Sequence, residues 1–133
     1  MRQKYGNRKV EFMGQTFDSA RERDRYVFLL GEVQRGVIRD LRRQVAFVLV
    51  PELREAEEVQ LKTKTKTVER VVQRAVTYRA DFVYVRCSDG VEVTEDVKIS
   101  PYLIPKEYVI KEKLLRWRYG IVVRRVYKAT ESV

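Results

Sequence analysis

The apolar residues of the first forty positions follow two different periods. Residues 10–17 are apolar around a central Gly14, a pattern that predicts a short β-hairpin. Beyond it, apolar side chains recur at the spacing of one helix face, which predicts a helix that buries that face. They are Tyr26, Leu29, Leu30 and Val33. Ser19 suits the N-cap, Glu22 completes a capping-box pattern, and Gly36 is suited to end the helix.

The rest of the chain predicts four strands and one more helix. The strands are apolar runs or strict alternations bounded by Pro, Gly or acidic residues. They are 44–50, 71–87, 91–100 and 120–127. Pro105 suits the first turn of a helix over 105–118, in which we expect Trp117 to lie in the core or at a dimer contact. The charged segment 52–70 predicts an insert that is either a protruding β-arm or a flexible loop.

Length and charge restrict the class of protein. A chain of 133 residues that is 44% hydrophobic and has no linker predicts one α/β domain over 1–133. Lys and Arg outnumber Asp and Glu by 28 to 19, and the net charge of +9 favours a polyanionic partner, either nucleic acid or an anionic membrane. We predict no membrane association, because no apolar run approaches the length of a spanning helix.

The residue types that are missing restrict the chemistry. The chain has no histidine, which excludes histidine general bases, catalytic triads and nearly all zinc sites. Its single cysteine, Cys87, excludes a framework of disulfides. Any catalysis must therefore use carboxylates, lysine and a hard metal ion.

Asp81, Asp96 and Lys98 are the candidate catalytic residues that alternation brings together. A two-residue turn in the 71–99 hairpin would place Asp81 opposite Lys98, and a four-residue turn at 87–90 would place it opposite Asp96. Either register puts the three on one sheet face. A regular three-residue turn would separate them. Glu95 should point to the other face of its strand.

Two carboxylates and an ammonium on one face suit metal-dependent phosphodiester chemistry. The carboxylates repel each other unless a cation lies between them, and Mg²⁺ prefers such hard oxygen ligands. The lysine can then stabilise the charge that develops on a phosphate or orient the attacking water. The competing interpretation is a solvated strand face with ordinary cross-strand ion pairs. Strongly apolar neighbours argue against it, because an unpaired carboxylate is costly among them.

Four segments together resemble a known family. They are KYGNRKVEFMGQTFDSARERDRY (4–26), TYRADFVYV (77–85), EDVK (95–98) and KEKLLRWRYGIVV (111–123). In this order they resemble small phage-encoded proteins of the PD-(D/E)xK nuclease superfamily, which are similar to archaeal-type Holliday junction resolvases. The resemblance skips only the 52–70 insert. The motif's proline is replaced by Ala80, a departure that is frequent in the superfamily.

The resemblance implies a fold, a cofactor and a site. The fold is a restriction-endonuclease-like core, with a mixed central β-sheet flanked by helices. The site is formed by Asp81, Asp96 and Lys98, and Glu22 on the first helix joins them as a fourth catalytic residue. Mg²⁺, or Mn²⁺ in its place, would be held by Asp81, Asp96 and the backbone carbonyl of Val97, with Glu22 as a further candidate ligand. No small-molecule cofactor is implied.

The expected activity is the resolution of four-way DNA junctions by paired cleavage, with 5′-phosphate and 3′-hydroxyl products. A homodimer would match the two-fold symmetry of a junction. The expected location is the cytoplasm of a phage-infected bacterium. The alternatives are a nickase or end-processing nuclease of phage recombination or packaging, and a non-catalytic nucleic-acid-binding protein. The basic residues expected to contact DNA are Lys4, Arg8, Lys62, Lys64, Lys66, Lys111 and Lys113.

Overall fold

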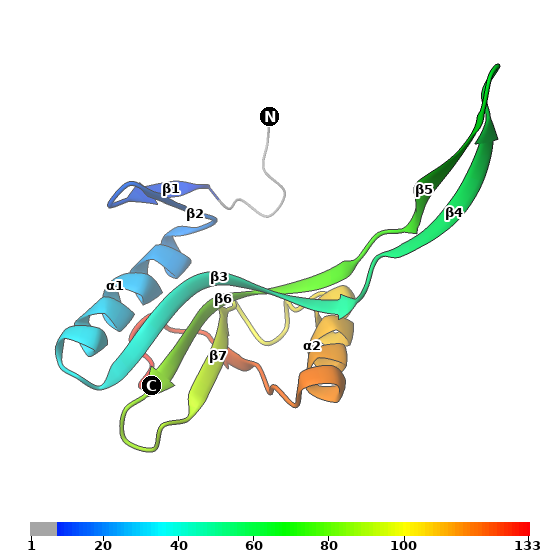
Figure 1. Cartoon of the computed structure of the whole chain (residues 1–133). Coiled ribbons are helices and arrows are strands. Elements are labelled where there is room, and N and C mark those ends of the chain that lie inside the picture. Colours follow the sequence, from blue (N-terminus) through cyan, green and yellow to red (C-terminus); the bar gives the residue numbers. More distant parts are fainter. Residues whose placement is uncertain (1–7) are drawn as a thin grey trace.

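Three antiparallel strands and one parallel strand form the central sheet of the protein. The computed structural model describes residues 8–133. Its elements are β1 (Val10–Phe12), β2 (Gln15–Phe17), α1 (Ala20–Gln34), β3 (Ile38–Val50), β4 (Leu53–Gln60), β5 (Thr65–Gln73), β6 (Val76–Arg86), β7 (Glu92–Val97), α2 (Lys106–Tyr119) and β8 (Arg124–Val126). The central sheet has the order β3-β6-β7-β8, and β8 alone runs parallel to its neighbour (Figure 1).

The two helices cover opposite faces of this sheet (Figure 1). Leu29 of α1 packs with Phe82 and Tyr84 of β6. Leu115 of α2 packs with Val83, whose side chain points the other way from its neighbours in the strand. This arrangement confirms the predicted α/β class with a mixed central sheet flanked by helices. It is compatible with a restriction-endonuclease-like core. Within residues 8–133, neither helix is long and apolar enough to cross a membrane.

Several strand boundaries differ from the sequence-based expectation. β3 begins at Ile38 rather than at residue 44, and the last strand is limited to Arg124–Val126. The run 71–87 is divided between β5 and β6. Apolarity alone could not reveal this division, because Val71 and Val72 are apolar yet exposed.

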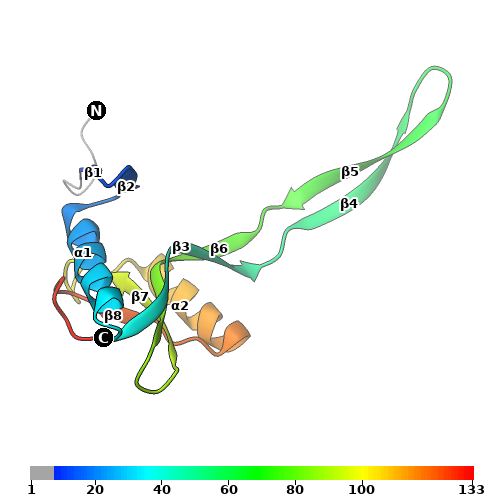
Figure 2. The same ribbon diagram turned by 60° about the vertical axis from the view of Figure 1, so that its left-hand side comes forward.

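β4 and β5 form a two-stranded arm that extends away from the central sheet (Figure 2). Every residue of both strands is exposed. Three residues expected to contact DNA lie on this arm. Lys62 and Lys64 belong to its tip and Lys66 to β5, and all three are presented to solvent.

Charged side chains dominate the buried face of α1. The residues buried there are Glu22, Arg25, Leu29 and Glu32. The expectation of an apolar face is therefore wrong in part, since Val33 is exposed. The fully buried guanidinium of Arg25 donates to both carboxylate oxygens of Glu95 on β7, at 2.6 and 3.0 Å, and to the carbonyl oxygen of Ala129 at 3.0 Å. This network ties α1 to the sheet and to the C-terminal segment.

Breaking the buried ion pair should strongly destabilise the protein. Arg25→Met should lower the free energy of unfolding by about 3–5 kcal/mol, because it leaves Glu95 as an uncompensated buried charge. Urea denaturation measures this loss. Arg23→Met is the matched control, because Arg23 lies on the same helix and, within residues 8–133, pairs only with its exposed neighbour Asp24. A loss below about 1 kcal/mol for Arg25→Met, in the range of exposed pairs, would contradict this interpretation.

Candidate active site

The candidate site lies where β6 and β7 separate. The last residues that pair between the two strands are Phe82 and Glu95. At the other end of the hairpin the backbone N–H of Arg86 donates to the carbonyl of Val91 at 2.9 Å, so the turn has four residues, 87–90. The four-residue register is thus confirmed, and the alternative that placed Asp81 opposite Lys98 is wrong.

Carboxylates replace backbone carbonyls as hydrogen-bond acceptors at this point. The backbone N–H of Asp81 donates to Oδ1 of Asp96 at 3.0 Å. In return, the backbone N–H of Val97 donates to Oδ2 of Asp81 at 2.9 Å. The two aspartates are therefore held between the separating strands, each by the backbone of the other strand.

The side-chain alternation of β6 shifts by one residue at Asp81. Ala80 packs in the same cluster as Val83, whereas Phe82 packs in the cluster on the opposite face. In a regular strand Ala80 and Phe82 would share a face. A regular strand would also place Arg79 and Val83 on one face, but here Arg79 is exposed and Val83 is buried.

The two adjacent acidic residues of β7, Glu95 and Asp96, differ in how completely their carboxylates are hydrogen-bonded. Glu95 points toward α1, as expected, and its carboxylate accepts hydrogen bonds from Arg25 and from the hydroxyl of Tyr84 at 2.8 Å. Asp96 is also fully buried, but its Oδ2 has no hydrogen-bond partner among the residues described. Nζ of Lys98 lies 3.8 Å from that oxygen, beyond hydrogen-bond range.

Lys98 is held beside the two aspartates by α2. Its side chain is only 10% exposed, and Nζ lies 3.0 Å from the centre of the Tyr108 ring. The negative face of the ring stabilises the ammonium. Burial lowers the pKa of Lys98, and the nearby carboxylates of Asp96 and Asp81 oppose that shift.

Glu22 lies in the first turn of α1 and is a neighbour of the site. Its backbone N–H donates to Oγ of Ser19 at 3.2 Å, which confirms the predicted cap. Its carboxylate Oε1 accepts a hydrogen bond at 2.8 Å from Nε2 of Gln44 and forms an ion pair with Arg43 at 3.3 Å. The same Gln44 nitrogen donates to Oδ1 of Asp81 at 3.3 Å, so Gln44 lies between Glu22 and Asp81.

Sequence reasoning missed Gln44. Its φ is +52°, in the left-handed region that residues other than glycine rarely adopt, although it lies within β3. In the pairing of β3 with β6, Arg43 is opposite Phe82 and Val45 is opposite Ala80. Gln44, between them, therefore stands opposite Asp81. Nothing in the local sequence signals a left-handed residue here, because a glutamine at the start of an apolar run is typical of an ordinary strand.

Burial makes both aspartates hard to ionise without a cation. It raises the pKa of Asp81 to about 7, and repulsion from Glu22 adds to this shift. Burial also raises the pKa of Asp96 to about 6, against the opposing charge of Lys98. Within residues 8–133, no three acidic or cysteine side chains gather closely enough to hold a metal ion by themselves. A metal ion held by the two aspartates would need water or backbone oxygens to complete its coordination.

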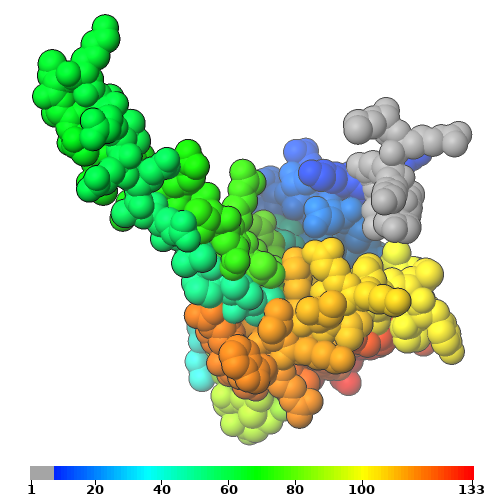
Figure 3. Space-filling model, turned by 90° about the vertical axis from the view of Figure 1, so that its right-hand side faces the viewer, coloured from blue at the N-terminus to red at the C-terminus, as the bar shows by residue number. Residues whose placement is uncertain are grey.

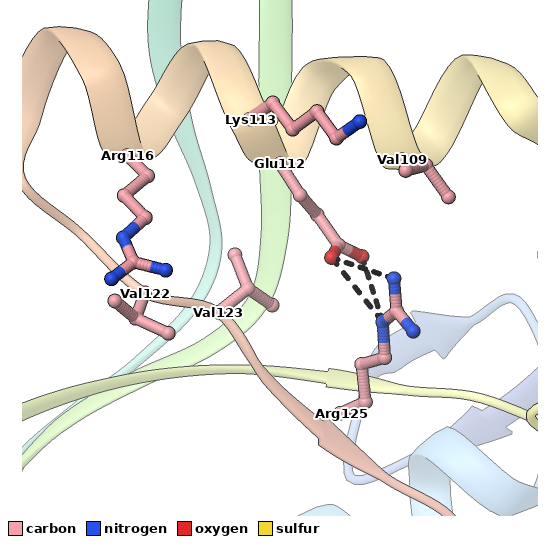
Figure 4. Close-up of a pocket in the computed structure, with 7 residues that line it drawn as sticks. All are labelled: Val109, Glu112, Lys113, Arg116, Val122, Val123 and Arg125. Carbon is pink, nitrogen blue, oxygen red and sulfur yellow. Dashed lines mark hydrogen bonds and ion pairs between the residues drawn. The ribbon is translucent and has the colours of Figure 1, made fainter.

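The other predicted DNA-contacting residues are spread over the molecule. Arg8 is exposed near the first strand, and Lys4 lies outside the described residues. Lys111 is paired with Glu107 at 3.3 Å. Lys113 is exposed and lines a pocket of about 200 Å³ between α2 and the segment before β8 (Figure 4).

That pocket adjoins the candidate site. Arg125 lines it and pairs with Glu112 of α2 at 2.9 Å, as the dashed lines of Figure 4 show. In the parallel pairing of β7 and β8, Arg125 is the partner of Asp96. The pocket therefore lies near Asp96.

Comparison with known proteins identifies a family. A family model described as "Protein of unknown function (DUF1064)" matches residues 2–131. No curated protein and no solved structure matches the chain.

Stability in metal-free buffer should reflect the buried Asp96. Because the folded-state pKa values of Asp81 and Asp96 are raised to about 7 and about 6, their contribution is fully present below the unfolded value of about 4 and is lost as the pH rises through the folded values. The free energy of unfolding should therefore fall between about pH 4 and about pH 8, and less in Asp96→Asn than in wild type.

Urea denaturation in EDTA across this pH range measures the effect. Asp89→Asn is the control, since Arg86 lowers the pKa of that exposed carboxyl and its loss cannot reduce the fall. Equal falls in wild type and Asp96→Asn would show that Asp96 ionises freely.

The backbone of Gln44 should be strained. Gln44→Gly and Gln44→Ala both remove the amide, but glycine adopts a positive φ without steric cost. The glycine variant should be more stable than the alanine variant by about 1 kcal/mol in urea denaturation. An alanine variant of equal or greater stability would mean that Gln44 is not left-handed in solution.

Proposed function

The chain belongs to the DUF1064 family. We propose that it is a metal-dependent endonuclease that cleaves branched DNA in an active site formed by Asp81, Asp96 and Lys98. One observation carries this proposal. Among the residues described, the fully buried carboxylate of Asp96 keeps one oxygen without a hydrogen-bond partner, and the buried ammonium of Lys98 lies too far from that oxygen for a hydrogen bond. Such an oxygen costs stability, so its retention favours a functional role.

The contrast with Glu95 supports a functional interpretation. Both acids are fully buried on the same strand, and Glu95 is satisfied by Arg25 and Tyr84. The sequence can therefore supply a complete partner set for a buried acid on this strand. Within residues 8–133 Asp96 has no complete partner set, and burial raises the pKa of Asp81 beside it. A cation bound between the two acids would explain both features.

The donor set fits a hard divalent ion. The residues that would hold Mg²⁺ are Asp81 and Asp96, with the carbonyl of Val97 as a further oxygen and Glu22 on the far side of Gln44. Two carboxylates with water and substrate oxygens are the usual environment of Mg²⁺. When bound, the ion would neutralise the carboxylates and polarise a phosphate oxygen.

The chain's own residues supply the remaining chemistry. The strand backbones fix Asp81 and Asp96, and Tyr108 holds Lys98 against the site. Lys98 can donate to a non-bridging phosphate oxygen and stabilise the charge that grows in the transition state. Water adds to phosphorus as the bond to the 3′ oxygen breaks, which leaves a 5′-phosphate and a 3′-hydroxyl.

The proposed substrate is a branched DNA such as a four-way junction. The net charge of +9 favours a nucleic acid. A homodimer would place two such sites on the two strands of a symmetric junction. The resemblance to resolvases supports the choice of a junction over simple duplex DNA.

Cleavage should depend on Lys98, Asp96 and the metal ion. With Mg²⁺, the protein should nick a four-way junction at symmetric positions and leave matched duplex, flap and single-stranded DNA largely intact. Lys98→Ala and Asp96→Asn should each reduce the cleavage rate at least about 100-fold while junction binding persists. Denaturing gels of end-labelled strands, with EDTA lanes, measure this.

Lys128→Ala is the matched control for Lys98, because Lys128 is exposed. Equal cleavage of all DNA forms would mean that the protein is a nickase or end-processing nuclease and not a resolvase. The absence of metal-dependent cleavage in every lane would refute the nuclease and leave a non-catalytic nucleic-acid-binding protein.

A further inference from the structure

The outward face of α2 carries apolar side chains that no described part of the chain covers. Trp117, the single tryptophan of the chain, is 82% exposed, and Ile110 is 58% exposed. Their spacing of seven residues, with Lys113 between them, puts the three on one side of the helix. Val122, just beyond the helix, is 63% exposed. The expectation that Trp117 lies in the core is therefore wrong.

Unpaired positive charge surrounds this apolar face. Lys113 and Arg116 form no ion pair with any carboxylate of residues 8–133, and both line the pocket beside Val122 (Figure 4). The two glutamates of α2 are already paired, Glu107 with Lys111 and Glu112 with Arg125. In the space-filling view α2, in orange, lies on the surface of the molecule (Figure 3).

We infer that this face, formed by Ile110, Lys113, Arg116, Trp117 and Val122, docks a DNA strand that carries unpaired bases. An exposed tryptophan offers a flat surface on which any base can stack, and neighbouring Lys and Arg hold the phosphates. Duplex DNA presents phosphates but no free base faces. A symmetric dimer through this face would bring two sets of like charges together, which disfavours a second copy as the occupant.

The location links this face to the candidate site. The pocket that Lys113 and Arg116 line also contains Arg125, the strand partner of Asp96. A strand that stacks on Trp117 would thus continue toward Asp96. The inference rests on the proposed function for the identity of the polymer as DNA, but binding itself needs neither metal nor cleavage.

Fluorescence of the single tryptophan tests the inference directly. In EDTA, an oligothymidylate of about 10 nucleotides should quench Trp117 emission, and a duplex of equal length should quench it much less. By anisotropy of a labelled oligonucleotide, Trp117→Ala should weaken binding about tenfold, and Trp117→Phe should retain most of it. Lys113→Gln with Arg116→Gln should reduce the salt dependence of binding. Val91→Ala, exposed beside the β6–β7 turn, should bind like wild type.

Two results would overturn the inference whatever the cleavage assays show. One is unchanged binding of the single strand by Trp117→Ala. The other is an emission that moves to shorter wavelength with protein concentration alone, which would mean that a second copy covers Trp117. A wild type that cuts no DNA yet binds single strands through Trp117 would instead refute only the nuclease. Metal-dependent cleavage without any quenching would support the nuclease and refute this face as its docking surface.

Discussion

The exchange of hydrogen bonds between Asp81 and Asp96 is the interaction on which the candidate site depends. Each carboxylate accepts the backbone N–H that the opposite strand would otherwise direct to a carbonyl. β6 and β7 can separate at this point without leaving those N–H groups unpaired, which would be costly in a buried region. The separation in turn fixes two acids side by side, and an ordinary ladder of strands could not hold them there. The backbone ladder thus defines the position of the carboxylates more tightly than side-chain packing alone.

The surrounding layers serve the same arrangement. On the α1 side, Arg25 neutralises Glu95 and attaches the helix that carries Glu22. On the α2 side, Tyr108 holds Lys98 near Asp96. Charge is therefore balanced on one face of β7 and left incomplete on the other. That asymmetry is the physical reason to assign the incomplete face to a metal ion and a phosphate.

Alternation in the sequence predicted part of this site. It placed Glu95 and Asp96 on opposite faces of one strand, and the structure confirms that separation. It could not choose between the registers, because turn length decides them and both turns suit the residues 87–90. The shift of alternation at Asp81 and the left-handed Gln44 were also hidden, since both follow from tertiary constraints that no local pattern records.

The wrong expectations about the burial of Val33 and Trp117 also come from tertiary interactions that a local sequence pattern does not record. Apolar spacing on α1 predicted a buried Val33, but the buried charges of Glu22, Arg25 and Glu32 determined which face turns inward. Trp117 was expected in the core or at a dimer contact, whereas α2 buries Leu115 in the core and turns Trp117 outward. Pattern identified the elements of this fold, while ion pairs and hydrogen bonds specific to the folded chain oriented them.

Direct titration of the site with a divalent ion is the measurement that tests the central claim most closely. In isothermal calorimetry near neutral pH or above, wild-type protein should bind Mn²⁺ with saturable heat and release protons as Asp81 and Asp96 ionise. Asp96→Asn should show no saturable heat, and Asp24→Asn, which alters an exposed carboxylate, should match wild type. Saturable binding that survives in Asp96→Asn, or heats of dilution alone in wild type, would contradict a metal site between the separating strands.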